Sequence, residues 1–122
     1  MPAAQNYVEL ARRNDAFRRT IVTGEHSQVV VMAIQPGDDI GEETHGGDQI
    51  LLFVEGEGRA VLSGESEPVR AGDLVFVPAG TLHNFVNAGP EPLRLVTVYA
   101  PPEHPDGTVH ETKADAEAAE QH

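Results

Sequence analysis

The side chains of this chain that are best suited to chemistry are polar groups able to bind a metal ion. Glu43 and His45 lie two positions apart, and Gln49 follows with the same odd numbering. On an extended strand, residues separated by an even interval point to the same side, so these three can face one interior. The chain has no cysteine, and any transition metal must therefore be held by nitrogen and oxygen ligands. A site built from imidazole, carboxylate and amide groups is the first hypothesis.

The elements that must position these side chains are short strands. Proline and glycine interrupt the sequence at short intervals, and the runs between them are rich in valine, isoleucine, leucine and phenylalanine. Seven such runs, with turn signals between them, predict an all-β sandwich or barrel. The predicted strands are Phe17–Thr23, Gln28–Ile34, Ile50–Glu55, Arg59–Ser63, Leu74–Pro78, His83–Asn87 and Leu93–Tyr99.

Turn and cap signals complete this outline. Glu55–Gly58 and Ser63–Ser66 place turn-forming residues between apolar runs, so the strands beside each turn are expected to pair as hairpins. Tyr7–Ala16 has a weak helical pattern, and Thr112–Asp115 resembles an N-cap in front of the helix-favouring Ala116–Glu120. Helices are therefore expected only near the two ends.

The spacing around His83 ties this residue to the same chemistry. A lone histidine on an apolar strand is ordinarily a buried side chain with satisfied hydrogen bonds. Here the segment from Gly72 to Asn87 reads glycine, five residues, proline, one residue, glycine, two residues, histidine, three residues and asparagine. It matches every fixed position of the second motif of the cupin superfamily, and on this segment the chain resembles the cupins.

The segment from Gly37 to Gly56 is similar to the first cupin motif, whose spacing is intact. Glu43 stands where the first histidine is usual, His45 keeps the second, and Gln49 stands where a glutamate is usual. Because Glu43 supplies the single negative charge, the total charge of the four ligand positions is unchanged. The resemblance therefore implies one divalent metal ion, with iron, manganese, nickel, cobalt and zinc as suitable ions. The implied ligands are Glu43, His45, Gln49 and His83.

The resemblance also implies a fold and a class of function. The fold is the cupin double-stranded β-barrel, which is jelly-roll-like, here with short helical N- and C-terminal segments. The function is that of a divalent-metal-dependent enzyme on a small oxygenated substrate, a sugar-derived or hydroxy or keto compound, with isomerase-type or dioxygenase-type chemistry. Two alternatives stay open: a non-catalytic module that binds or senses a small molecule or metal, and a barrel without metal in which Glu43 and Gln49 only form hydrogen bonds.

Length and charge limit the organisation and the partners. The 122 residues predict one domain, with an N-terminal segment and first strand (1–25), the cupin barrel (26–100) and a C-terminal tail (101–122). The net charge of -12 disfavours nucleic acid and anionic membranes. No leader or membrane-spanning segment can be recognised, so a cytoplasmic location is expected. The expected partners are a small-molecule substrate and a second copy, in a homodimer formed through Val29, Val31 and the Phe17–Thr23 strand.

The ending of the chain is similar to that of small cupins called mannose-6-phosphate isomerase-like. The segment that contains His104 and His110 also contains three prolines and is too rigid for a random coil, so it is expected to pack. It can fold over the barrel, reach a partner subunit, or form a surface strap without chemistry. His26 and His122 are expected to be bystanders. The residues expected to be structural are Asn87, Gly37, Gly56, Gly72 and Gly80.

Overall fold

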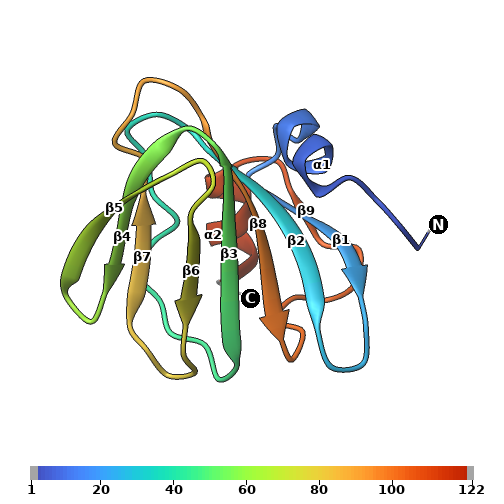
Figure 1. Cartoon of the computed structure of the whole chain (residues 1–122). Helices are drawn as coiled ribbons and strands as arrows, with labels where there is room; N and C mark the ends of the chain where they lie inside the picture. The colour runs from blue at the N-terminus through green and yellow to red at the C-terminus, as the bar shows by residue number, and fades with distance from the viewer. Residues whose placement is uncertain (1–2, 121–122) are drawn as a thin grey trace.

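The chain forms two antiparallel sheets that face each other, with a short helix near each end (Figure 1). The structure is a computed structural model, and it describes residues 3–120. The elements are α1 (Tyr7–Arg13), β1 (Arg18–Thr23), β2 (Gln28–Ile34), β3 (Asp48–Glu55), β4 (Glu57–Leu62), β5 (Glu65–Arg70), β6 (Leu74–Val77), β7 (His83–Val86), β8 (Leu93–Ala100), β9 (Val109–His110) and α2 (Lys113–Glu120). The larger sheet has the order β6-β3-β8-β2-β1-β9, and the smaller has the order β5-β4-β7. The predicted all-β fold with short terminal helices is confirmed.

The continuous apolar sequence of β2 is explained by cover on both faces of the larger sheet. Val30 and Met32 face the interior between the sheets, where they belong to the main hydrophobic core. Val31 faces the other way and packs with Ala11 of α1. Figure 1 shows α1 lying against the outer side of this sheet. A strand that is buried on both faces loses the alternation of polar and apolar residues that marks a half-exposed strand.

The register of the larger sheet divides the interior into a polar end and an apolar end. Gln49 pairs with Tyr99, and Tyr99 pairs with Gln28, so these three residues form one inward row across β3, β8 and β2. The next two inward rows are Leu51–Thr97–Val30 and Phe53–Leu95–Met32. Alternation along each strand selects the inward face, and pairing aligns the rows. The candidate ligand Gln49 therefore lies at the polar end.

The smaller sheet contains a strand that the sequence pattern does not predict. Glu65–Arg70 is mostly polar and includes Pro68, which weakens a strand prediction, yet it forms β5 at the edge of the sheet. The short β9 was not predicted either. The predicted turn before β5 is confirmed, since Ser63 and Gly64 both have positive φ, as in a two-residue hairpin turn.

The hairpin predicted at Glu55–Gly58 is wrong. β3 pairs with β6 and β8, whereas β4 pairs with β5 and β7, so this turn carries the chain from one sheet to the other. Gly56 has a φ of 90°, and a Cβ there would lie 2.6 Å from the carbonyl oxygen of Pro92. The turn requires glycine for both reasons. Local turn signals cannot separate a hairpin from a crossover because both use the same residues.

The C-terminal tail folds back over the barrel. β9 pairs with β1, and Ala116 of α2 is buried in the core between the sheets. The Asp115 N–H donates to Thr112 Oγ1 over 3.1 Å, which confirms the predicted N-cap. Among residues 3–120, no helix is long and apolar enough to cross a membrane.

The single lysine of the chain anchors α2 to the barrel. Lys113 Nζ forms ion pairs with Asp39 and, over 3.2 Å, with Asp38. Hydrogen bonds from Lys113 and Asn84 hold the pKa of Asp39 below its usual 3.8. Burial opposes the charge of Lys113, but the bonds to the two carboxylates raise the pKa of Lys113 above 10.5. Both groups therefore stabilise the fold in their charged forms.

We expect Lys113→Met to lower the free energy of unfolding at neutral pH by about 0.5–1 kcal/mol, as for a partly exposed ion pair. The contribution of Asp39 is complete above its unfolded pKa of 3.8 and is lost as the pH falls through its lower folded pKa. Urea unfolding should therefore give a constant difference between wild type and variant from about pH 5 to 8, which shrinks only below pH 3.8. Arg12→Met, on the exposed face of α1, is the control. A difference that has already vanished at about pH 5 would contradict this interpretation.

Candidate metal centre

Backbone hydrogen bonds place Glu43 and His83 side by side, although they are far apart in the sequence. The Glu43 N–H donates to the His83 carbonyl oxygen (2.9 Å), and the His83 N–H donates to that of Glu43 (3.0 Å). The expectation that Glu43 and His45 share a strand is wrong. Glu43 forms only this isolated bridge, and His45 lies in a connecting segment, because Gly46 and Gly47 interrupt the extended chain before β3 begins.

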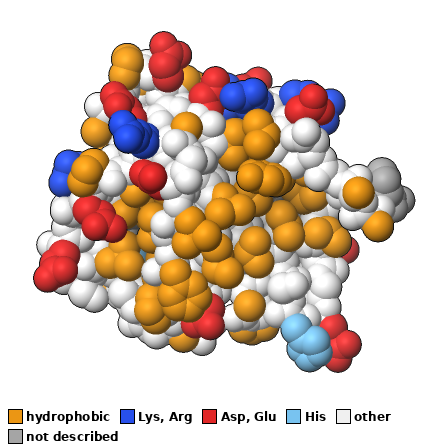
Figure 2. Space-filling model, viewed as in Figure 1, with side chains coloured by type: hydrophobic (Ala, Val, Ile, Leu, Met, Phe, Trp, Pro, Cys, Tyr) orange, Lys and Arg blue, Asp and Glu red, His pale blue; other side chains and the backbone are white. Residues whose placement is uncertain are grey.

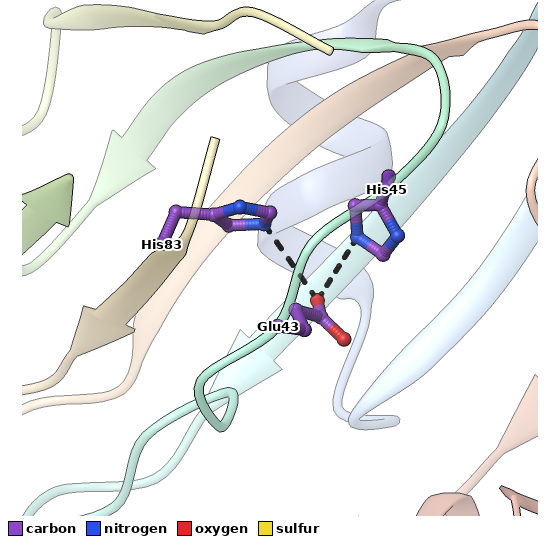
Figure 3. Close-up of side chains that lie close together, drawn as sticks. All are labelled: Glu43, His45 and His83. Carbon is purple, nitrogen blue, oxygen red and sulfur yellow. Dashed lines mark hydrogen bonds and ion pairs between the residues drawn. The ribbon is translucent and has the colours of Figure 1, made fainter. Parts of the chain in front are cut away.

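Three of the four predicted ligands nevertheless gather, as Figure 3 shows. Glu43 Oε1 lies 3.2 Å from His45 Nε2 and 3.9 Å from His83 Nε2. One donor atom from each residue lies within 4.8 Å of the other two. Two imidazole nitrogens and a carboxylate oxygen at these separations can bind one divalent ion.

The hydrogen bond of His83 determines which of its nitrogens is available to a metal. Nδ1 lies 2.9 Å from the carbonyl oxygen of Thr81, and a carbonyl only accepts, so Nδ1 carries the proton. Nε2 then has a lone pair, and among the described residues this buried atom has no hydrogen-bond partner. A buried acceptor without a donor costs about 1–3 kcal/mol. A bound cation removes that cost.

His45 lies between two carboxylates. Its Nε2 faces Glu43, and its Nδ1 is 2.8 Å from Glu103 Oε1. Burial opposes the charged ring, but Glu43 and Glu103 outweigh it and raise the pKa of His45 above 6.5. Burial likewise opposes ionisation of Glu43, yet His45, Arg18 and His83 lower the pKa of Glu43 below 4.5. A metal ion would replace the proton on Nε2, while the Nδ1 proton keeps its bond to Glu103 and orients the ring.

Gln49 is buried at the polar end, and its amide is only half satisfied. Nε2 donates to Thr97 Oγ1 over 3.0 Å, whereas the buried Oε1 has no hydrogen-bond partner among the described residues. The side-chain amide oxygen of Gln49 and Nε2 of His83 are thus two buried hydrogen-bond acceptors without a donor among the described residues. Together with Glu43 and His45, these atoms form a set of nitrogen and oxygen ligands that suits a divalent metal ion. The cluster itself contains Glu43, His45 and His83. That Gln49 is a fourth ligand stays a prediction.

Gln28 and Glu103 support the site, although no sequence motif marks either residue. Gln28 Oε1 accepts from the N–H groups of Glu103 (3.2 Å) and His104 (3.0 Å), and Gln28 Nε2 donates to the His104 carbonyl oxygen (2.8 Å). This clamp holds the tail so that Glu103 reaches His45. The tail carries no motif that would mark Glu103. The sequence signal for Gln28 is that a polar residue begins the otherwise apolar strand β2.

The other histidines occupy different environments. His26 has a side chain 88% exposed, as expected for a bystander, while His122 lies outside the described residues. His104 packs edge-on against the Tyr99 ring, with centroids 5.2 Å apart. Burial and the charge of Arg18 lower the pKa of His104 to about 4, so it is neutral at neutral pH. The tail therefore contributes side chains to the polar end, and packing over the barrel is the confirmed placement.

The residues predicted to be structural have structural contacts. The buried Asn87 side chain donates to the carbonyl oxygens of Ile34 and Glu91, both over 2.8 Å. Gly37, Gly72 and Gly80 all have positive φ, which favours glycine. None of these contacts requires a metal or substrate.

Two cavities lie beside the polar end. One of about 350 Å³ is lined by His45, Tyr99 and Glu103 among others, and one of about 390 Å³ is lined by residues that include Arg18 and His104. A larger cavity, of about 540 Å³, lies along the β4–β5 hairpin and contains none of the predicted ligands. Side-chain chemistry, rather than cavity size, therefore identifies the site.

Comparison with known proteins agrees with this fold. The family described as cupin domain matches residues 30–99, more than half of the chain, and the chain belongs to this family. The uncharacterized protein YrkC of Bacillus subtilis is 45% identical over 127 residues, which cover 98% of this chain and 68% of that protein. The crystal structure of BH2720 from Bacillus halodurans has a TM-score of 0.94 and 46% identity, covering 97% of this chain and 95% of that one. An acireductone dioxygenase of Parvibaculum lavamentivorans is 27% identical over 107 residues, covering 77% of this chain and 58% of that protein.

Glu43→Gln keeps the shape of the side chain but removes its charge. Metal affinity should fall by roughly 3 kcal/mol, more than a hundredfold, because no carboxylate among the ligands then offsets the charge of the ion. The unfolding free energy of the metal-free protein should stay within about 1 kcal/mol of wild type. Melting curves of chelator-treated protein with added metal measure both quantities.

Glu65→Gln, which removes an exposed carboxylate from β5, is the matched control. A Glu43→Gln variant that keeps the full rise in melting temperature with added metal would show that Glu43 is not a ligand.

Proposed function

We propose that the chain is a metal-dependent enzyme of dioxygenase type, acting on a small hydroxy or keto compound. The observation that carries this proposal is the cluster of Glu43, His45 and His83. Two histidines and one carboxylate, with positions left open, are the donor set of non-haem iron(II) oxygenases. The similarity to an acireductone dioxygenase supports the same class of chemistry.

Each residue of the site has a distinct role in this proposal. When bound, a redox-active ion such as iron(II) supplies the one-electron chemistry that lets dioxygen react with an organic molecule. Glu43, His45 and His83 hold the ion, Gln49 is proposed as a fourth ligand, and Glu103 orients the His45 ring. In the reaction proposed, both oxygen atoms of O2 enter the products and the substrate supplies all the electrons, so no external reductant is required.

The walls around the cluster favour a small substrate. Phe85 packs beside His83, with ring centroids 6.0 Å apart, and Phe53 packs against Phe85 at 5.9 Å. On the other side, Tyr99 lies 5.6 Å from the His45 ring. These aromatic rings restrict the space beside the cluster, which favours a small substrate.

Oxygen uptake by the reconstituted protein tests the proposal. Chelator-treated protein is loaded without air with iron(II), manganese, cobalt, nickel or zinc, then given small hydroxy acids, keto acids, enediols and 1,3-diketones. Iron(II)-loaded wild type should consume one O2 per molecule of at least one substrate. His83→Ala should lose both metal and uptake, whereas His26→Ala, which removes an exposed histidine, should keep both.

Two other outcomes would replace the proposal with a different one. Exchange of substrate protons with deuterated solvent, without oxygen uptake, would favour the isomerase-type chemistry of the mannose-6-phosphate isomerase-like resemblance. Tight binding of metal and ligand with neither reaction would favour a binding or sensing module. The expectations of a cytoplasmic location and of no nucleic-acid or membrane partner stay part of the proposal.

We also propose a homodimer formed through the outer face of the larger sheet. Register places five apolar residues in one row across five strands of this face. The row is Val22, Val29, Val98, Ile50 and Phe76. Figure 2 shows the apolar surface gathered in the centre of this view. Val22 and Phe76 are exposed and the other three are partly exposed, and such an apolar row on an outer sheet face favours a second copy as its partner. Val31, expected at the interface, is instead covered by α1.

The mass in solution tests the dimer. Light scattering at micromolar concentration should give twice the mass of one chain, because pairing removes the apolar row from water. Val22→Lys, at a position 43% exposed in the row, should give single chains. Leu82→Lys, equally exposed but in the loop before β7, should leave the dimer intact. A wild-type mass of one chain would refute the proposal.

A further inference from the structure

Arg18 is a buried cation that lacks an anionic partner. It begins β1 and is 3% exposed, although the chain has 20 acidic residues and 8 basic ones. No carboxylate of the described residues forms an ion pair with it, whereas Arg19, the next residue, reaches Glu111 on the surface. An unpaired charge inside a protein costs several kcal/mol. The Phe17 ring, whose centroid lies 5.3 Å from the guanidinium carbon, and the attraction to Glu43 offset part of this cost. An anion from outside the chain would offset more of it.

One edge of the Arg18 guanidinium is held by a side chain, whereas Nε on the other edge has no hydrogen-bond partner among the described residues. Nη1 lies 3.1 Å from His110 Nδ1, and since guanidinium only donates, His110 accepts. Nε is buried without a hydrogen-bond partner among the described residues. Nε and Nη2 lie on the same edge of the planar group, where two parallel N–H bonds match the two oxygens of a carboxylate.

The space beside Arg18 is a cavity of about 390 Å³ formed where the tail crosses the barrel. It is lined by Arg18, His104, Pro105, Thr108, His110 and Ala119. His104 contributes a second polar atom, because its buried Nε2 also has no hydrogen-bond partner among the described residues. Two unpartnered polar atoms beside one cavity indicate a place for a polar ligand.

The cavity is connected to the metal centre by a series of ring contacts. His83 contacts His45 at 5.1 Å, His45 contacts Tyr99 at 5.6 Å, and Tyr99 contacts His104 at 5.2 Å, measured between centroids. The charge of Arg18 helps to lower the pKa of Glu43 and that of His104. Arg18 therefore acts electrostatically on both His104 in the cavity and the candidate ligand Glu43.

We propose that Arg18 binds the carboxylate of a small organic acid, with His104 as a second polar contact, beside the metal centre. Arg18 is then a binding residue that selects hydroxy or keto acids among the oxygenated substrates considered above. Only the description of the acid as a substrate rests on the proposed function. The carboxylate site itself rests on the burial of Arg18 and on its Nε, which has no hydrogen-bond partner among the described residues.

Binding to metal-free protein tests this site separately from the metal. Chelator-treated protein is titrated by calorimetry with pyruvate, lactate and malonate, with the neutral amide of each acid, and with inorganic phosphate. At least one acid should bind wild type about tenfold or more tightly than its amide, because only the acid can form the paired bonds to Arg18.

Three variants identify the residue responsible. Arg18→Met should lose this preference for the acid, Arg18→Lys should keep part of it because it keeps the charge without the planar fork, and Arg19→Met is the control on the outer face. Without ligand, Arg18→Met removes a buried charge that has no ion pair but also removes the bond to His110, so its melting temperature should stay near that of wild type. A purely structural arginine predicts a lower melting temperature.

The proposal is overturned if every acid fails to bind, if acid and amide bind alike, if Arg18→Met keeps the preference, or if phosphate is preferred to all the acids. Failure of oxygen uptake by metal-loaded protein would leave these binding results unchanged. The metal centre, in turn, does not depend on the acid preference, so the two proposals can fail independently.

Discussion

Two hydrogen bonds between the backbones of Glu43 and His83 connect the halves of the candidate site. They join an irregular segment before β3 to the first residue of β7, and so bring a carboxylate and an imidazole from distant parts of the chain together. His45 follows Glu43 closely enough to complete the cluster. Because backbone groups make this bridge, the ligand side chains remain free to bind an ion.

Strand register places polar side chains near this bridge and apolar side chains farther into the interior. The row of Gln49, Tyr99 and Gln28 places polar groups near the cluster, and the following rows form the hydrophobic core. Gln28 has a second role, since it clamps the tail that brings Glu103 to His45. The apolar rows thus stabilise the barrel, and the polar end of the interior holds the candidate ligands in place.

The sequence predicts the parts of this site that depend on short spacings. Motif spacing identifies Glu43, His45 and His83, and strand parity places Gln49 inside, where it is 2% exposed. It does not predict contacts that depend on tertiary folding, such as Gln28 with His104, which are 76 positions apart. For the same reason it misses the crossover at Gly56 and the buried environment of Arg18, because local residue types do not show which sheet or cavity they will enter.

An anomalous-scattering map of crystals grown from iron(II)- or cobalt(II)-loaded protein tests the central claim most directly. The structure predicts one strong peak per chain, bound by Glu43, His45 and His83 Nε2, with Gln49 Oε1 as the fourth ligand. A peak without Gln49 would correct only the fourth ligand. Fully loaded protein with no peak at this cluster, and His83 Nε2 left without a ligand bond, would contradict the metal centre.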